Sequence, residues 1–158
     1  MITAACATAP VPPPGGTAQV PTSAEGAAVI RAAEALFTAM EARDTTALRR
    51  LFMPEAQLAV VRRGGAGEVV IQTRTVGDFV GSIGRGSELL LERMWSPSVQ
   101  VEGDLATLWA PYDFHQGERF SHCGIDAFQF VRTGGEWRIV ALTYTIQTES
   151  CAPPPGTP

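Results

Sequence analysis

Residues 119–147 read RFSHCGIDAFQFVRTGGEWRIVALTYTIQ, and this stretch decides the fold. Two runs typical of β-strands flank Gly134 and Gly135, and a glycine pair between such runs predicts a two-residue hairpin turn. The turn places Thr133 opposite Glu136, and this pair sets the register of both strands. The stretch therefore predicts a long antiparallel hairpin.

One face of this hairpin changes character along its length. Successive side chains of a strand point to opposite faces, so every second residue shares a surface. This surface is apolar near the turn and polar at the far end, which suits a pocket with a few convergent polar groups. On the first strand it holds Phe120, His122, Gly124, Asp126, Phe128 and Phe130. The partners expected for the last five are Gln147, Thr145, Thr143, Ala141 and Ile139, in that order.

The opposite face is too apolar to lie open to water over its whole length. An exposed apolar patch of this kind indicates a partner surface. The alternative is that the two faces are reversed and this side carries the core. The residues concerned are Ile125, Ala127, Val131, Val140, Leu142, Tyr144 and Ile146.

The elements upstream of the hairpin define the fold class. Helical periodicity, strand-like runs and turn residues divide the chain into consecutive segments. Helices come first, then a short hairpin and a third helix, then a long meander, and this order predicts an α+β fold. The expected helices are 23–43, 47–52 and 76–84, and the expected strands are 56–62, 68–75, 89–101, 105–115, 119–132 and 136–147.

The register of the strand 105–115 stays open. A change of one residue in the turn after it would exchange the faces of all its side chains. Tyr112 and Phe114 line the pocket in one case, and Trp109, Pro111 and Asp113 in the other. Tyr112 is then a proton donor or ligand clamp, or else an aromatic core residue with its hydroxyl at the rim.

His122 and Asp126 are the candidate catalytic residues. A histidine titrates near neutral pH and can act as general acid or base, with Asp126 as second proton carrier or orienting group. Their Cα atoms should lie roughly 13 Å apart on one strand, so both could reach a ligand placed between them. The structural alternative is a histidine bonded to a neighbouring strand and an aspartate satisfied by Thr143 or an arginine.

The two ends of the chain differ from the middle. Residues 1–22 are rich in alanine and proline and predict a disordered tether, residues 152–158 predict a disordered tail, and 23–151 predict a single domain. Small residues before Cys6 resemble the cleavage site of a bacterial lipoprotein, although no basic region or apolar core precedes it. We therefore expect export to the periplasm or a lipid anchor at Cys6, with a cytoplasmic location as the alternative.

Cys123 and Cys151 are a candidate disulfide. The predicted register places Cys123 opposite Ile146, five residues short of Cys151, whereas a disulfide needs Cα atoms within about 7 Å. The bond therefore requires the chain to turn back after Gln147. The alternative is two unrelated thiols.

The composition argues against several classes of function. The 158 residues carry a net charge of −4, which disfavours nucleic acid as a partner. No apolar run is long enough for a transmembrane segment. With two histidines and no metal-ligand spacing, phosphate loop or dinucleotide fingerprint, we expect no metal and no cofactor.

Three short runs resemble a known family. They are Trp109-Ala110-Pro111-Tyr112-Asp113-Phe114, Ser121-His122-Cys123-Gly124 and Gly135-Glu136-Trp137-Arg138-Ile139-Val140. With the order of elements, they resemble the nuclear transport factor 2-like or SnoaL-like superfamily, in a bacterial branch described as lumazine-binding. The resemblance implies a cone-shaped α+β fold with an internal pocket and a homodimer through the sheet. It implies no single reaction.

These observations predict a small-molecule-binding pocket protein. One alternative is a cofactor-free lyase or isomerase that uses His122 and Asp126 as acid and base. Another is a dimeric accessory domain whose cavity is filled by its own side chains. The ligand-binding residues predicted for the pocket are Tyr112, Trp109, Phe120, Phe128, Thr143 and Thr145.

Overall fold

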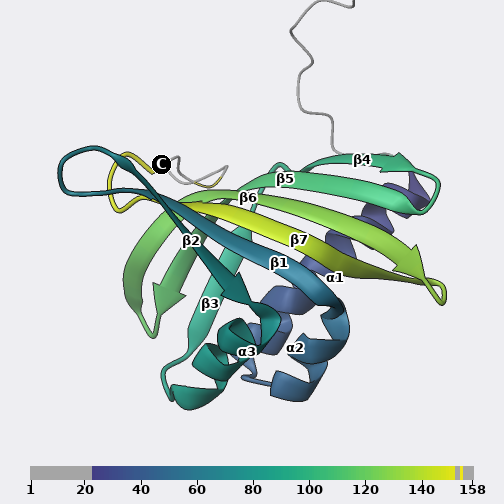
Figure 1. The fold of residues 1–158 in the computed structure, drawn as a ribbon, viewed down its shortest axis with the longest axis horizontal. Helices are drawn as coiled ribbons and strands as arrows, with labels where there is room; N and C mark the ends of the chain where they lie inside the picture. The colour runs from purple at the N-terminus through teal and green to yellow at the C-terminus, as the bar shows by residue number, and fades with distance from the viewer. Residues whose placement is uncertain (1–22, 152–153, 155–158) are drawn as a thin grey trace, which may run out of the picture.

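The computed structural model describes residues 23–151 and 154. These residues form three helices that pack on one side of a seven-stranded sheet (Figure 1). The order of elements confirms the predicted α+β fold. The predicted tether, with Cys6, and all of the predicted tail except Pro154 lie outside the described residues. The elements are α1 (Ala24–Glu41), α2 (Thr45–Leu51), β1 (Phe52–Arg63), β2 (Val69–Thr75), α3 (Val76–Arg85), β3 (Leu90–Met94), β4 (Ser98–Glu102), β5 (Leu105–Gln116), β6 (Arg119–Thr133) and β7 (Glu136–Ile146).

Each helix begins at a side chain that caps its free backbone N–H groups. The Ser23 hydroxyl accepts from the Gly26 amide at 3.0 Å, and the Asp44 carboxylate accepts from two amides of α2. Thr75 caps α3 in the same way. The three glycines of α3 disfavour a helix, but the apolar side of α3 is buried and this burial outweighs them. No helix of the described residues is long and apolar enough to span a membrane.

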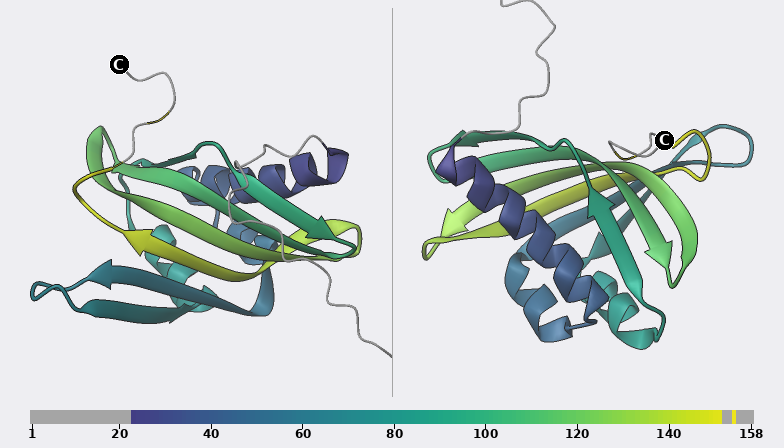
Figure 2. Two further views of the ribbon diagram at one scale, coloured as in Figure 1. Left: turned by 90° about the horizontal axis from the view of Figure 1, so that it is seen from above. Right: turned by 180° about the vertical axis from the view of Figure 1, so that it is seen from behind.

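The sheet is curved, and the helices cover its concave side (Figure 2). Its strand order is β2-β1-β7-β6-β5-β3, with β4 also paired to β5. Among the described strands, β1 and β7 are the pair that runs parallel. The core lies between helices and sheet, and its fully buried side chains include Leu36, Leu48, Val80, Leu58, Phe128 and Ile139.

The expected single strand 89–101 is two strands. Both β3 and β4 pair with β5, but residues 95–97 interrupt the strand between them. Ser96 has a positive φ of 47°, and Pro97 has no N–H to donate to a ladder. This interruption of the strand allows β3 to pack against α1 and to close one side of the space between the helices and the sheet.

The β6–β7 hairpin keeps the predicted register only near its turn. The pairs from Thr133–Glu136 to Phe130–Ile139 are as predicted, but Val140 is an extra residue in β7. This β-bulge shifts the pairing by one residue, so that Asp126 faces Tyr144 rather than Thr143. The predicted partners of Phe128, Asp126, Gly124 and His122 are therefore wrong.

The bulge also exchanges the faces of β7, because side chains alternate with a period of two. Leu142, Tyr144 and Ile146, which the sequence placed on the outer surface, line the interior instead. Thr143 is exposed on the outside. The outer face is accordingly less apolar than expected, and the homodimer stays a prediction.

A second bulge sets the register of β5 and β6. Gln116 pairs with Arg119 across a two-residue turn, and Phe114 pairs with His122 while His115 pairs with Phe120. Ser121 is thus the extra residue. Tyr112 and Phe114 point inward, which resolves the open register, whereas Trp109 and Phe120 point outward.

The structure joins Cys123 to Cys151, with Cα atoms 5.9 Å apart. Gln147 exchanges two backbone hydrogen bonds of 2.9 Å with Cys123. The chain then turns at Ser150, which has a positive φ of 56°, and so returns Cys151 to β6. The disulfide therefore fastens the end of β7 beside His122.

Candidate functional site

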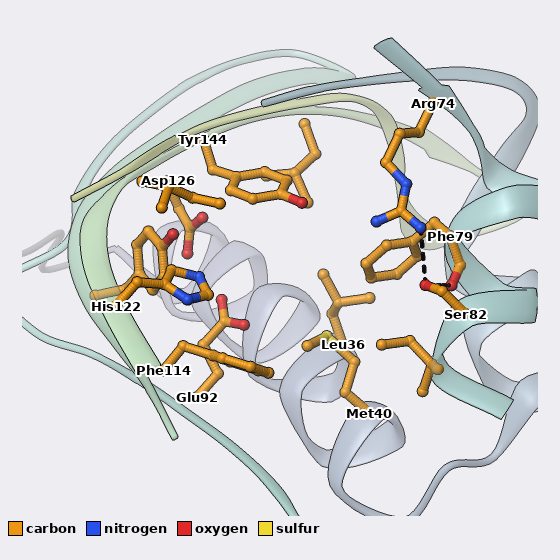
Figure 3. Close-up of a pocket in the computed structure, with 14 residues that line it drawn as sticks. Leu36, Met40, Arg74, Phe79, Ser82, Glu92, Phe114, His122, Asp126 and Tyr144 are labelled. Atoms are coloured by element: carbon orange, nitrogen blue, oxygen red, sulfur yellow. Dashed lines mark hydrogen bonds between the residues drawn. The ribbon is translucent and has the colours of Figure 1, made fainter. Parts of the chain in front are cut away.

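A cavity of about 250 Å³ lies between α1, α3 and the concave face of the sheet (Figure 3). Its walls are mostly apolar, and its polar side chains gather at two ends. Glu92, His122 and Asp126 form one polar end, and Arg74, Ser82 and Tyr144 form the other. The apolar walls are Leu36, Met40, Phe79, Ile83, Phe114, Leu142 and Ile146, and Tyr112 also lines the cavity.

Two carboxyl groups approach each other at the first end. Asp126 on β6 is only 2% exposed, and its Oδ2 atom has no hydrogen-bond partner among the described residues. Glu92 on β3 extends toward it from the opposite wall (Figure 3). Glu92 is partly buried as a residue, and its carboxyl group is enclosed by the surrounding protein.

Burial raises the pKa of both carboxyl groups. For Glu92 the rise comes from burial first and then from the charge and hydrogen bond of Asp126. Burial raises the pKa of Asp126 to about 7, and the hydrogen bond with Glu92 opposes that rise. Two carboxylates in one apolar site cannot both ionise freely, so the pair retains a proton near neutral pH.

His122 lies beside this pair. Its Nδ1 atom is 3.0 Å from the Ser121 hydroxyl, and its ring packs against Phe114 and Tyr112. Burial lowers the pKa of His122, so the ring is neutral at physiological pH. Its Nε2 atom has no partner within the described part of the chain. His122 can therefore offer one more hydrogen bond, as donor or acceptor according to its tautomer.

Tyr112 lines the cavity and connects β5 to β7 through a hydrogen bond of its hydroxyl. Its hydroxyl donates to the carbonyl oxygen of Thr145 at 2.8 Å, and burial, followed by the nearby carboxyl charges, raises its pKa far above the ordinary value. The side-chain oxygen of Thr145 accepts from the Ile125 amide at 2.9 Å. Tyr112 thus lines the cavity with its ring while its hydroxyl is committed to the backbone, and Thr145 serves the sheet instead of the cavity.

Arg74 on β2 dominates the second end. Its Nη2 atom donates to the Ser82 hydroxyl at 2.9 Å and to the Asp78 carbonyl oxygen at 3.4 Å. Its guanidinium lies 5.9 Å from the centre of the Phe79 ring. Burial raises the pKa of Tyr144, and the charge and hydrogen bond of Arg74 oppose that rise, so the Tyr144 hydroxyl is a neighbour of the guanidinium.

Five of the six predicted ligand-binding residues lie elsewhere, including Thr145, whose side chain bonds to the backbone of the sheet. Trp109 is 57% exposed on the outer face, and Phe120 is 40% exposed, with its ring against His115. Phe128 is buried in the core, where it stacks on Phe130. Thr143 is exposed. Of the predicted set, the structure brings His122, Asp126 and Tyr112 to the cavity.

Of the two charged residues that the prediction missed, Glu92 has a recognisable sequence signal and Arg74 does not. Glu92 occupies the inward face of β3 between Leu90 and Met94, and a carboxylate between two apolar residues at alternate positions marks a buried polar group. Arg74 ends the strand before α3. Its approach to Tyr144 depends on the parallel pairing of β1 with β7, which no local pattern in the sequence indicates.

The described residues hold no group of three or more histidine, cysteine, aspartate or glutamate side chains placed to bind a metal. At one end, Glu92, Asp126 and His122 offer proton exchange and hydrogen bonding. At the far end the site offers a positive charge.

Comparisons with known proteins agree with this architecture. The helices on a curved sheet with an internal cavity form the fold of the proteins described as nuclear transport factor 2-like. The chain belongs to the family described as "Putative lumazine-binding", whose sequence model matches residues 24–145. The comparison with curated proteins found no match to the chain.

Solved structures show the same fold at low sequence identity. The β subunit of a putative aromatic-ring-hydroxylating dioxygenase from Novosphingobium aromaticivorans is 19% identical, with 80% of this chain and 91% of that chain covered and a TM-score of 0.64. An NTF-2 like protein of unknown function from Silicibacter pomeroyi is 24% identical, with 80% and 99% covered and a TM-score of 0.58. A putative dehydratase from Streptomyces avermitilis is 19% identical, with 77% and 95% covered and a TM-score of 0.60. These likenesses concern the fold alone.

The carboxyl pair makes stability depend on pH. Because the folded-state pKa of Asp126 is raised, its contribution is present below the unfolded value of about 4 and is lost as pH rises through about 7. The lowered pKa of His122 has the opposite effect on stability: as the pH falls below about 6.5, the unfolded chain takes up a proton more readily than the folded protein, and the free energy of unfolding decreases. We therefore expect Asp126 to lower the free energy of unfolding progressively from about pH 4 to about pH 7, and His122 no longer opposes this decline above about pH 6.5.

Urea unfolding at several pH values measures this slope. Asp126→Asn, which cannot ionise, should flatten the decline, whereas Glu118→Gln at an exposed position should retain it. The slope attributable to one proton is at most about 1.4 kcal/mol per pH unit. A decline that is parallel in the wild type and Asp126→Asn would show that the pair does not titrate in this range.

Proposed function

We propose that the cavity binds a small, largely flat organic molecule. The observation that carries this proposal is a mostly apolar cavity with polar atoms left over at both ends. Apart from the proton that it shares with Glu92, Asp126 Oδ2 receives no hydrogen bond within the described residues, and Arg74 is held by neutral oxygens and forms no salt bridge with them. Buried polar groups are normally satisfied, so a site with such groups left over is prepared for a polar ligand or for water.

The size of the cavity supports a small ligand. Its volume of about 250 Å³ is below the roughly 300–1,000 Å³ that is common for sites of drug-sized molecules. The cavity is also not filled by the aromatic residues expected to close it, because Phe128 lies in the core and Trp109 and Phe120 lie outside. This disfavours an accessory domain with a collapsed cone.

A matched pair of variants on β7 tests the proposal. Ile146→Trp places an indole in the cavity and should abolish binding of small aromatic fragments, measured by saturation-transfer NMR. Thr143→Trp adds the same side chain on the outer face of the same strand and should leave fragment binding unchanged. Equal binding by both variants would place the fragments outside the cone.

Proton-transfer catalysis is the second candidate function. The convergence of Glu92, Asp126 and His122 favours it, since the structure brings together groups that can hold and release a proton near neutral pH. In such a reaction Asp126 would take a proton from the bound molecule, and Glu92 would stabilise the resulting charge by hydrogen bonding. Solvent deuterium exchange into a bound ligand, lost in Asp126→Asn, is the measurement that separates catalysis from binding alone.

A further inference from the structure

We infer that the ligand is a single-ring organic anion, whose negative group pairs with Arg74 and whose opposite end donates an N–H or O–H group to Asp126. This inference rests on the proposed binding function and names the class of ligand. Four steps support it.

Arg74 is held by neutral partners, as Arg43 is, but of these two arginines Arg74 is the one that lines the cavity. Arg93 is paired with Asp113, and Arg132 is paired with both Glu25 and Asp104. Arg74 is also held in place, but its partners are the neutral Ser82 hydroxyl and Asp78 carbonyl oxygen. It is therefore a fixed cation without a salt bridge to any carboxylate of the described residues, because its acidic neighbour Asp78 is exposed and its carboxylate accepts from Thr75 instead.

The remaining donors of Arg74 are available to a ligand. A guanidinium has five N–H donors in a planar fork, and the hydrogen bonds to Ser82 and Asp78 both involve the same nitrogen, Nη2, while a further one joins the guanidinium to the Tyr144 hydroxyl. The Ser82 hydroxyl donates to the Phe79 carbonyl oxygen at 2.6 Å, so it holds Arg74 and has no hydrogen left for a ligand. The Tyr144 hydroxyl lies beside the guanidinium and adds a further donor. A planar carboxylate matches such a fork.

The other end of the cavity would repel a negative group. Asp126 and Glu92 already share a confined space, and a third carboxylate there would add a like charge to a buried site. Asp126 lines the cavity and is only 2% exposed, and apart from the proton that it shares with Glu92 its Oδ2 atom receives no hydrogen bond within the described residues, so this end suits a ligand N–H or O–H donor. The charges thus orient the ligand with its anion toward β2 and its donor toward β6.

The space between the two ends limits the body of the ligand. Phe79 and Phe114 present aromatic rings, and Leu142 adds an aliphatic surface. These walls suit one flat ring, and the volume leaves no room for a large fused system. Aromatic and partly saturated rings share this chemistry, so the class is a ring carboxylic acid with a hydroxyl or amino group on the opposite side.

Isothermal titration calorimetry with three probes tests the inference. They are 4-hydroxybenzoate, 4-hydroxybenzamide, which is neutral but similar in size, and benzoate, which lacks the donor. We expect the wild type to bind 4-hydroxybenzoate at least about tenfold more tightly than either of the others, because each comparison removes one charge-assisted or buried hydrogen bond. Arg74→Gln should remove the preference for acid over amide, and Arg74→Lys should retain part of it.

Arg62→Gln is the matched control, because Arg62 is exposed on the neighbouring strand β1 and does not line the cavity. It should keep the full preference, and near-UV circular dichroism checks that every variant is folded. Equal affinity of the wild type for 4-hydroxybenzoate and 4-hydroxybenzamide would overturn the inference that the ligand is an anion. A preference for the acid that survives Arg74→Gln would overturn the pairing of that anion with Arg74. If the wild type binds none of the three probes, the inferred class of ligand is also wrong. The proposed binding function would still hold in that case if the wild type binds small aromatic fragments and Ile146→Trp abolishes this binding.

Discussion

Replacing Gly124 by alanine is expected to cause the largest loss of stability of any conservative substitution in the sheet. A Cβ atom at this position would lie 2.0 Å from the carbonyl oxygen of Thr145 and 2.7 Å from its side-chain oxygen. The nearer contact is with backbone, so no change of rotamer can relieve it. That carbonyl oxygen also accepts the Tyr112 hydroxyl, and the Thr145 side chain accepts the Ile125 amide.

The added methyl group would therefore disrupt two buried hydrogen bonds together with the strand pairing. We expect a decrease of roughly 3–5 kcal/mol in the free energy of unfolding, which is a large part of the stability of an ordinary domain. Urea unfolding followed by far-UV circular dichroism measures it. Gly65→Ala is the control, since nothing lies within 4 Å of its Cβ position, and its cost should stay below about 1 kcal/mol. Equal stabilities of the two variants would contradict this account of the β6–β7 contact.

Removal of the Cys123–Cys151 disulfide should give the second largest effect. The bond closes a loop with a sequence separation of 28 residues, for which chain entropy predicts a stabilisation of roughly 3–4 kcal/mol. A double Cys123→Ala, Cys151→Ala variant should lose about this amount. Because the bond fastens the chain just after Ile146, the variant should also bind fragments more weakly.

The comparison is made in a Cys6→Ser background, so that no other thiol can exchange with the pair. Reduction by dithiothreitol should lower the stability of this background chain to that of the double variant and should leave the double variant unchanged. If reduction has no effect on the background chain, the two cysteines are not bonded in solution. Such a disulfide is typical of proteins in oxidising compartments, but export of this chain stays a prediction.

Local sequence patterns predicted most of the elements of the fold. Helix caps at Ser23, Asp44 and Thr75 and the glycine pair at the last turn act over three or four residues, so they can be interpreted without knowledge of distant contacts. Gly134 and Gly135 have φ values of 61° and 82°, as this turn type requires. Alternation along β6 also placed His122 and Asp126 on the cavity side.

The same reasoning failed on β7, where a single residue changed the outcome. Val140 forms a bulge in the middle of a run that looks like an uninterrupted strand, and no glycine, proline or polar residue marks it. Beyond the bulge every predicted partner is displaced by one. Thr143 and Thr145 therefore leave the predicted pocket, and Tyr144 enters the actual one.

What the sequence by itself determined is the order of the elements, the α+β class, the last turn and the inward positions of β6, because these depend on neighbours along the chain. The tertiary structure alone decided which polar groups meet. Glu92 reaches Asp126 because β3 bends away from β4, and Arg74 reaches the cavity because β1 pairs in parallel with β7. The physical reason is that bulges, strand breaks and long-range pairings arise from packing around a curved sheet, and that packing decided which side chains line the cavity.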